Sequence, residues 1–187
     1  MAEKDAGSGV TRRHFLGASI ASLACLGPLP AFAHPRKPYE RSVSFRHTHT
    51  SESLNIVYWV QGKYVPDALK EINHVLRDHR TGDVKRIAPQ LVDLLYAMRR
   101  RLDTSKPFDV VSGYRSPATN AMLRRNSSRV AKSSFHMEGM AIDVRVPGVE
   151  PRVLAQLARG MSAGGVGYYP RTNFVHLDVG PVRSWRG

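Results

Sequence analysis

Two short segments in the second half of the chain alternate between apolar and polar positions. In Met140 to Val146, every second side chain is apolar, and Asp143 belongs to the intervening set. In Phe174 to Val179, the apolar set alternates with a set that contains His176 and Asp178. Because side chains along a β-strand point to opposite faces in turn, each segment predicts a strand with one buried face. If the two strands pair, Asp143 and His176 lie on the same face of the sheet.

The remaining periodicity predicts further strands and helices. Alternation and β-forming residues predict a hairpin or short meander and two more strands, in Arg41 to His49, Leu54 to Val60, Phe108 to Ser112 and from Val166 onward. Apolar side chains at helical spacing predict helices in Pro66 to Arg80, Pro89 to Leu102, Thr119 to Arg125 and Pro151 to Ser162. The last helix is expected to bury Val153, Leu154, Leu157, Ala158 and Met161.

The first 33 residues read as an export signal. A twin-arginine pattern in Thr11 to Gly17 precedes an apolar run from Ala18 to Leu29 that is too short to span a bilayer. Ala31-Phe32-Ala33 then offers a small-x-small cleavage site. This order of features favours a signal peptide over an internal buried helix. We therefore predict a twin-arginine leader in residues 1–33 and one mature periplasmic domain, residues 34–187, without a stable membrane anchor.

The only cysteine of the 187-residue chain, Cys25, lies in this leader. The mature domain is thus expected to contain no disulfide and no thiolate metal ligand. Lipidation of Cys25 is a possible alternative to simple cleavage, but Ser22-Leu23-Ala24 is a poor lipobox.

The chain is strongly basic, with a formal net charge of +13. Such a surface favours an anionic partner, either nucleic acid, anionic lipid or the acidic polymer of the cell wall. Export and the lack of a nucleic-acid-binding motif argue against nucleic acid. The charge leaves anionic lipid and the cell-wall polymer as candidate partners, and we expect the protein to be a monomer.

A third residue with metal-binding capacity, His136, lies outside the two strands that carry Asp143 and His176. Seven extended residues would place His136 roughly 23 Å from Asp143, so the chain has to turn back for both to reach one metal. Glu138-Gly139 is the natural bend, because glycine tolerates positive φ. Two histidines and one carboxylate are a common protein ligand set for catalytic zinc.

Other interpretations of the histidines are less well supported. His136 and His176 could be buried core histidines beside a structural aspartate. A cytidine-deaminase interpretation of His136-x-Glu138 fails because the mature domain lacks cysteine ligands. His47 and His49 form an H-x-H pair on one predicted strand face, but no carboxylate is paired with them locally, which favours a structural or surface role. His74 and His79 fall away from the apolar stripe of their predicted helix and are expected to be solvated.

The residues around this cluster resemble a known family. The motif Ser-x-His-x-x-Gly-x-Ala-x-Asp, which ends at Asp143, is similar to that of the LAS metallopeptidases, a group of lysostaphin-type enzymes, D-alanyl-D-alanine peptidases and the hedgehog domain. Three further segments carry the likeness, namely Ser112 to Ser116, Gly164 to Pro170 and Gly180 to Trp185. Together with Phe174-Val175-His176 they resemble YcbK-type periplasmic murein endopeptidases over nearly all of the mature domain.

The resemblance implies a fold and an activity. The fold is α+β and hedgehog/DD-peptidase-like, with a central antiparallel sheet and flanking helices. The activity is that of a zinc-dependent murein endopeptidase, which hydrolyses peptide cross-links of peptidoglycan. One Zn²⁺ per chain is implied at His136, Asp143 and His176. Arg115 matches the family arginine that contacts substrate and stabilises the oxyanion, although a helix-cap or salt-bridge role is the alternative.

The chain departs from the family pattern at the general base. Many D-Ala-D-Ala peptidases carry a glutamate or histidine just before the last ligand, where this chain has Asn173 and Phe174. Asp178 could accept the proton, or it could orient an imidazole as a second-shell carboxylate. Glu138, in the bend, is a further candidate for the base.

The departure at the base leaves two other functions open. One is a D-Ala-D-Ala-type carboxypeptidase that trims stem peptides, and the other is a non-catalytic zinc-containing peptidoglycan-binding module. Neither the residues nor the resemblance decides between 4-3 and 3-3 cross-links.

Overall fold

A computed structural model of the chain describes residues 39–127 and 130–187. The predicted signal peptide, residues 1–33, lies outside the described residues. No helix in the described part is long and apolar enough to span a membrane.

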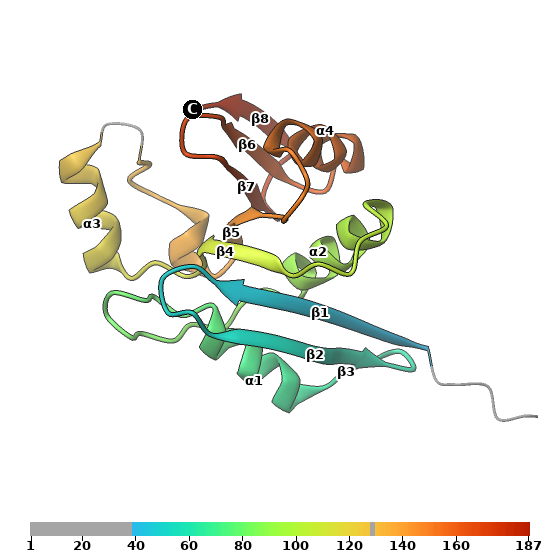
Figure 1. Ribbon diagram of the computed structural model, residues 1–187. Helices are drawn as coiled ribbons and strands as arrows, with labels where there is room; N and C mark the ends of the chain where they lie inside the picture. Colours follow the sequence, from blue (N-terminus) through green and yellow to red (C-terminus); the bar gives the residue numbers. More distant parts are fainter. Residues whose placement is uncertain (1–38, 128–129) are drawn as a thin grey trace, which may run out of the picture. The chain divides into compact units, whose positions relative to one another are not determined.

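The described chain forms one mixed eight-stranded sheet with flanking helices (Figure 1). The strands are β1 (Glu40–His47), β2 (Ser53–Val60), β3 (Lys63–Tyr64), β4 (Phe108–Ser112), β5 (Ala141–Arg145), β6 (Gly165–Tyr169), β7 (Phe174–Asp178) and β8 (Arg183–Arg186). The helices are α1 (Pro66–Val75), α2 (Pro89–Arg101), α3 (Pro117–Asn126), the short 3₁₀ helix η1 (Phe135–Glu138) and α4 (Pro151–Met161).

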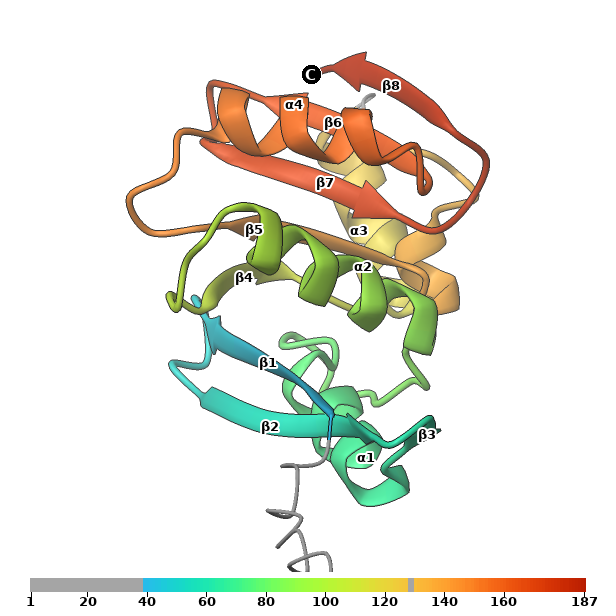
Figure 2. The same ribbon diagram turned by 90° about the vertical axis from the view of Figure 1, so that its right-hand side faces the viewer.

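The strand order is β3-β2-β1-β4-β5-β7-β6-β8. The central strands β4, β5, β7 and β6 pair antiparallel, whereas β1 joins β4 and β8 joins β6 in parallel. The predicted α+β class with a central antiparallel sheet is confirmed, and the parallel pairs at its flanks make the whole sheet mixed. Helices α2 and α4 cover one face, while α3 and η1 lie on the other (Figures 1 and 2).

One hydrophobic core fills the space between the sheet and the helices α1, α2 and α4. Strand β5 contributes Ile142 and Val144, and β7 contributes Val175 and Leu177. All four side chains are fully buried. These are the apolar sets that alternation predicted to be buried. The opposite sets of the same strands consequently face α3 and η1, and they include Asp143 and His176.

Helix α1 ends at Val75, five residues before the end predicted from the apolar stripe. The reason is Asp78, whose carboxylate accepts hydrogen bonds from the N–H groups of Arg80 and Ser116, at 2.9 and 2.8 Å. An aspartate that bonds nearby backbone in this way competes with the helix. His79 therefore lies in a turn, where it is half-buried and stacks on His49, instead of being solvated on a helix.

Two other predictions of detail were wrong, and two strands were not predicted. Val153 is 48% exposed, so the buried face of α4 is narrower than predicted and rests on Leu154, Ala155 and Ala158. His49 lies beyond the end of β1 and does not share a strand face with His47. Strands β3 and β8 were not predicted, because two- and four-residue edge strands carry too little alternation to be recognised.

Substitution of Gly139 tests whether the bend depends on close packing against the backbone of Arg86. The φ of Gly139, +68°, is left-handed, and a Cβ at this position would overlap the carbonyl oxygen of Arg86. Gly148 has a comparable φ of +81°, but no atom lies within 4 Å of the position of its Cβ. We expect Gly148→Ala to cost about 1 kcal/mol of unfolding free energy for its backbone conformation alone. Gly139→Ala should cost about 2 kcal/mol more because of the overlap.

Urea unfolding of both variants and the wild type measures this difference. Equal losses in the two variants would show that the backbone at Arg86 yields without cost and that the bend does not depend on close packing.

Candidate metal centre

The pairing of β5 with β7 places the first two functional side chains together. Asp143 and His176 are direct partners in the antiparallel register. Directly opposite residues in such a pair have Cβ atoms about 4.5–5.5 Å apart, within reach of one small ligand. The sequence prediction that these two residues share a sheet face is confirmed.

His136 reaches the same point through a tight turn. It lies in η1, which begins after Ser134 and ends at Gly139 in the left-handed conformation. The side chain of Ser134 accepts the N–H of His136, and the N–H of Gly139 is bonded to the carbonyl of His136. The predicted bend at Glu138-Gly139 is confirmed, and it turns His136 back over the sheet.

Three ligand-type atoms converge in this buried place. Nε2 of His136 lies 3.2 Å from Oδ1 of Asp143 and 3.1 Å from Nδ1 of His176, and Nδ1 of His176 lies 2.9 Å from the same Oδ1. The exposed fraction is 1% for His136, 3% for Asp143 and 9% for His176. No other group of three metal-capable side chains converges so closely within the described residues.

In each imidazole, the ring nitrogen that points away from the cluster (the outer nitrogen) has a hydrogen-bond partner. Nδ1 of His136 lies 2.7 Å from the carbonyl oxygen of Gly113, which only accepts, so this nitrogen carries the proton. Nε2 of His176 lies 3.0 Å from Oδ2 of the buried Asp178, and it donates to that carboxylate. In the neutral imidazoles, the inner nitrogens therefore present lone pairs to each other and to the carboxylate of Asp143.

Three converging lone pairs in a buried site need a cation between them. Ligand atoms about 2.0–2.1 Å from a tetrahedral zinc lie about 3.3 Å apart, close to the separations in this cluster. Each imidazole also has the outer acceptor that usually fixes the tautomer of a metal-bound histidine. The donor set and its geometry thus fit a divalent transition metal.

The protonation states are consistent with metal binding. Burial lowers the pKa of His136 to about 4, which keeps its imidazole neutral at pH 7. Burial would raise the pKa of Asp143, but the His136 imidazole and the Arg115 guanidinium beside it outweigh this effect and hold that pKa well below its ordinary value. Burial lowers the pKa of His176, yet its hydrogen bonds to Asp143 and Asp178 outweigh burial and leave that pKa raised.

Arg115 lies beside the metal ligands, after the end of β4. Its Nη2 pairs with Oδ2 of Asp143, the oxygen that does not face the imidazoles, and its Nε donates to Oγ of Ser112 at 2.8 Å. The side chain is 16% exposed. Arg115 is also one of the residues that line a cavity beside the cluster.

Asp178 is fully buried behind His176 and is surrounded by donors. Its carboxylate accepts hydrogen bonds from His176, from the N–H groups of Gly165 and Gly180 and from both terminal nitrogens of Arg183, at 2.7 to 3.1 Å. Burial would raise its pKa, but the His176 and Arg183 hydrogen bonds outweigh it and hold the pKa below its ordinary value.

A cavity of about 920 Å³ opens onto His136, Asp143 and His176, the candidate metal ligands. Its wall comes from the end of α3, the loop before η1, the β6–β7 turn and β8. Trp185 of β8 lies 5.2 Å from the ring of His176, and a Cβ on Gly167 would come within 2.6 Å of the indole, so that glycine makes room for it. Asp143 is the only side-chain carboxylate among the described residues that line the cavity.

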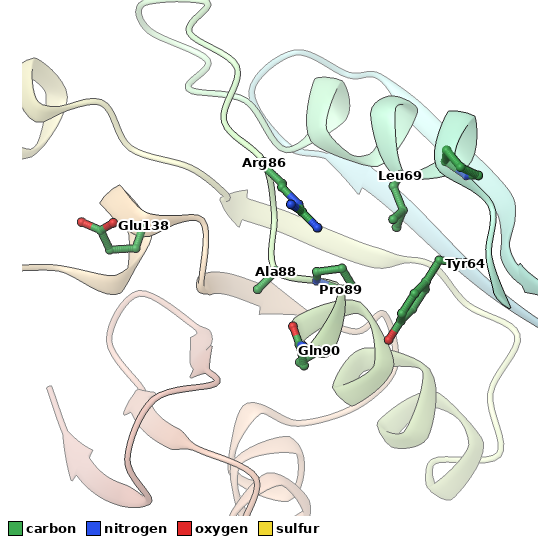
Figure 3. Close-up of a pocket in the computed structure, with 8 residues that line it drawn as sticks. Tyr64, Leu69, Arg86, Ala88, Pro89, Gln90 and Glu138 are labelled. Atoms are coloured by element: carbon green, nitrogen blue, oxygen red, sulfur yellow. The ribbon is translucent and has the colours of Figure 1, made fainter. Parts of the chain in front are cut away.

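Glu138 is not part of this cavity. Its side chain is exposed and lines a different pocket of about 640 Å³ with Tyr64, Leu69 and Arg86 (Figure 3). The bend that brings His136 inward turns Glu138 outward, so this candidate for the general base does not reach the cluster. Asn173, in the turn before β7, and Phe174, stacked on Tyr169, offer no base either.

His47, His49 and His79 form a separate group. His47 is buried, and its Nδ1 accepts the N–H groups of His49 and Thr50, at 3.2 and 3.3 Å. The rings of His49 and His79 stack at 4.1 Å with an angle of 8° between them. Parallel rings do not aim their nitrogens at one point, and the predicted structural role fits the buried member of this group.

Several residues of the site had no signal of their own in the sequence. Ser112 and the carbonyl of Gly113 hold Arg115 and His136 from the end of β4. Arg183 and Trp185 reach the site from an edge strand that alternation does not reveal. Only their place in a motif of the resembled family pointed to them.

The comparisons with known proteins decide the family. The model of a family described as "Peptidoglycan L,D-endopeptidase MepK" matches residues 36–185. The chain belongs to this family of peptidoglycan endopeptidases. The resemblance to murein endopeptidases that the sequence motifs indicated is thereby confirmed.

Two curated relatives agree with the family model. Peptidoglycan L,D-endopeptidase MepK of Escherichia coli K12 is 42% identical over 166 residues, which cover 89% of this chain and 91% of that protein. Probable peptidoglycan L,D-endopeptidase MepK of Haemophilus influenzae is 39% identical over 161 residues, 86% and 87% of the two chains. The crystal structure of Serratia marcescens L-Ala D-Glu endopeptidase ChiX is a distant match, with 24% identity, a TM-score of 0.34 and 51% and 68% coverage.

Metal addition tests the cluster. A divalent metal that binds the folded protein at about 1,000 times its Kd should stabilise it by about 4 kcal/mol, or roughly 10 °C in Tm for a domain of this size. We expect this shift for the metal-stripped wild type and for His49→Ala, a histidine outside the cluster. His176→Ala should lose it, and an undiminished shift in that variant would place the metal elsewhere.

Proposed function

We propose that this enzyme hydrolyses 3-3 peptide cross-links of peptidoglycan with a zinc ion held by His136, Asp143 and His176. The relatives are named L,D-endopeptidases, and the 3-3 bond joins an L- to a D-centre, whereas the 4-3 bond joins two D-centres. The observation that carries the metal assignment is the convergence of the three lone-pair atoms at 2.9–3.2 Å in a buried site.

Zinc is the proposed metal because of its ligand chemistry. Two imidazoles and one carboxylate, with a fourth position open to a cavity, are a common arrangement at catalytic zinc. When bound, zinc supplies Lewis acidity, which polarises a peptide carbonyl and acidifies water. The residues of the chain provide the orientation and the charge around this centre.

Arg115 is proposed to stabilise the negative charge that develops on the carbonyl oxygen of the substrate. A guanidinium held in place before the reaction stabilises such charge without reorganisation. The hydrogen bond to Ser112 and the ion pair with Asp143 support this role, because they hold the guanidinium beside the ligands at the cavity wall.

Asp178 is proposed to orient His176 and to keep its tautomer, and not to act as the general base. A base needs to reach the proton it removes, and Asp178 is 0% exposed and accepts five hydrogen bonds. Its position behind the ligand imidazole is that of a second-shell carboxylate, which fixes the ring and raises its basicity.

The location follows from substrate and charge. We propose that the enzyme works in the periplasm after twin-arginine export, because the leader pattern and the peptidoglycan substrate agree. The net charge, +13 for the whole chain and +12 without residues 1–33, should hold it near the anionic sacculus, and the effect should weaken as salt increases.

Digestion of purified sacculi tests the activity. Zinc-loaded wild type should convert 3-3 cross-linked dimers into monomers, and His176→Ala should release none, as read by mass spectrometry of the muropeptides. Sacculi with only 4-3 linkages serve as the comparison substrate. Loss of terminal D-alanine without loss of dimers would instead identify a carboxypeptidase, and binding without any product would identify a non-catalytic module.

Asp178→Asn separates the two roles of that residue. If Asp178 orients the ligand, zinc affinity should fall about 10–100-fold, as is typical when a second-shell partner is lost. Activity should then recover to within about tenfold of wild type at saturating zinc. A general base would leave the zinc affinity unchanged and cost about 100-fold or more in kcat at any zinc concentration.

A further inference from the structure

Three consecutive backbone N–H groups around Arg115 are all used in hydrogen bonds. That of Tyr114 donates to the carbonyl of Leu76 at 2.7 Å, and that of Arg115 donates to the carbonyl of His136 at 3.2 Å. The N–H of Ser116 donates to Oδ2 of Asp78 at 2.8 Å. The backbone on both sides of Arg115 is therefore tied to the segment that follows α1.

Asp78 joins the loop 113–116 to the segment that follows α1. It is 1% exposed, and its other oxygen, Oδ1, accepts the N–H of Arg80 at 2.9 Å. Burial would raise its pKa, but hydrogen bonds from Thr119, Ser116 and Arg80 outweigh it and lower the pKa to about 2. The carboxylate is thus ionised at pH 7, and it lies at the N-terminus of α3, where the helix dipole favours negative charge.

Close approach of the two segments depends on Gly113. A Cβ at this position would overlap the backbone carbonyl of Leu76, so only glycine allows the contact. The carbonyl of the same Gly113 holds the ring of His136 at 2.7 Å. The loop 113–116 thus contacts the metal ligands on one side and the segment of Asp78 on the other.

We propose that Asp78 is a positioning residue for Arg115. The inference rests on the proposed role of Arg115 in stabilising the oxyanion. The guanidinium donates hydrogen bonds to Ser112 and to Asp143. Because Asp143 also faces the proposed metal site, its carboxylate does not serve Arg115 alone. The position of the Arg115 guanidinium therefore also depends on the position of the backbone in the loop 113–116. An error of about 1 Å in such placement costs on the order of 100-fold in rate.

Asp78→Asn is the central variant. The amide can accept one N–H through its oxygen, but its NH₂ group replaces the second acceptor and leaves one donor unmatched. We expect kcat on 3-3 cross-linked dimers to fall about tenfold with KM within about twofold, because the loop shifts by less than 1 Å. In an Arg115→Ala background, the same substitution should cost no further activity.

Asp93→Asn is the matched control for lost stability. Asp93 also accepts several hydrogen bonds, from Arg41 and Tyr58 at 2.9 Å each and from Tyr64, and none of these donors belongs to the loop 113–116. It should lower the Tm and leave kcat unchanged. If Asp78→Asn costs as much in the Arg115→Ala background as in the wild type, the residue is merely structural and the proposal is wrong.

A second readout does not depend on activity. The Nε–H of Arg115 donates to Ser112, and its NMR signal should be shifted and protected from solvent exchange in the wild type. Asp78→Asn should move this signal toward that of a free arginine and speed its exchange at least about tenfold. Asp93→Asn should leave the signal in place. An unchanged signal in Asp78→Asn would overturn the proposal whether or not the protein cleaves peptidoglycan.

A substitution pair at Ser116 removes the same contact from its other end. Ser116 has a φ of −61°, which proline adopts, and proline has no N–H to donate to Asp78. Ser116→Ala loses the hydroxyl that caps α3 but keeps the N–H. The proposal requires Ser116→Pro to reproduce the loss in kcat and the NMR shift, and Ser116→Ala to leave both near wild type. This pair decides the question if Asp78→Asn fails to fold.

The outcomes separate this proposal from the proposed function. If the wild type is inactive but its Arg115 NMR signal is shifted and responds to Asp78→Asn, the peptidase assignment is refuted and the positioning contact is supported. An active wild type whose kcat and Arg115 signal ignore both Asp78→Asn and Ser116→Pro would refute the positioning role alone.

Discussion

The structure around the site depends on three buried lone-pair atoms that face one another. Nε2 of His136, Nδ1 of His176 and Oδ1 of Asp143 repel each other unless a cation lies between them. Without a metal, a proton on His176 relieves part of this repulsion, in keeping with its raised pKa. Folding of the sheet therefore prepares a site whose electrostatic demand a divalent ion meets better than a proton does.

This demand explains the layer of residues behind the ligands. An imidazole can face a metal with either nitrogen, and the partner of the other nitrogen decides which one. The carbonyl of Gly113 decides it for His136, and the carboxylate of Asp178 decides it for His176. Arg183 in turn pairs with Asp178, so the edge strand β8 supports the site from behind His176 as well as through Trp185 at the cavity wall.

The sequence predicted the parts of the site that depend on periodicity. Alternation in β5 and β7 was sufficient to bring Asp143 and His176 to one face, and the glycine at 139 was sufficient to predict the turn that returns His136. The end of α1 could not be predicted, because it depends on a hydrogen bond between Asp78 and Ser116, 38 residues apart in the sequence. The outward direction of Glu138 was also hidden, since a bend in the sequence does not reveal which of its side chains faces the sheet.

Two buried aspartates outside the ligand set have opposite surroundings, and the difference bears on catalysis. Asp78 is held by backbone N–H groups and hydroxyls at a helix N-terminus, whereas Asp178 is held by a ligand imidazole and by Arg183. The proposed role of the first is to position Arg115, and that of the second is to orient His176 and raise its basicity. Neither carboxylate reaches the cavity, where Asp143 is the only side-chain carboxylate among the described lining residues. Since Asp143 also faces the candidate metal site, no other side-chain carboxylate of the described lining is placed to accept a proton from a molecule in the cavity.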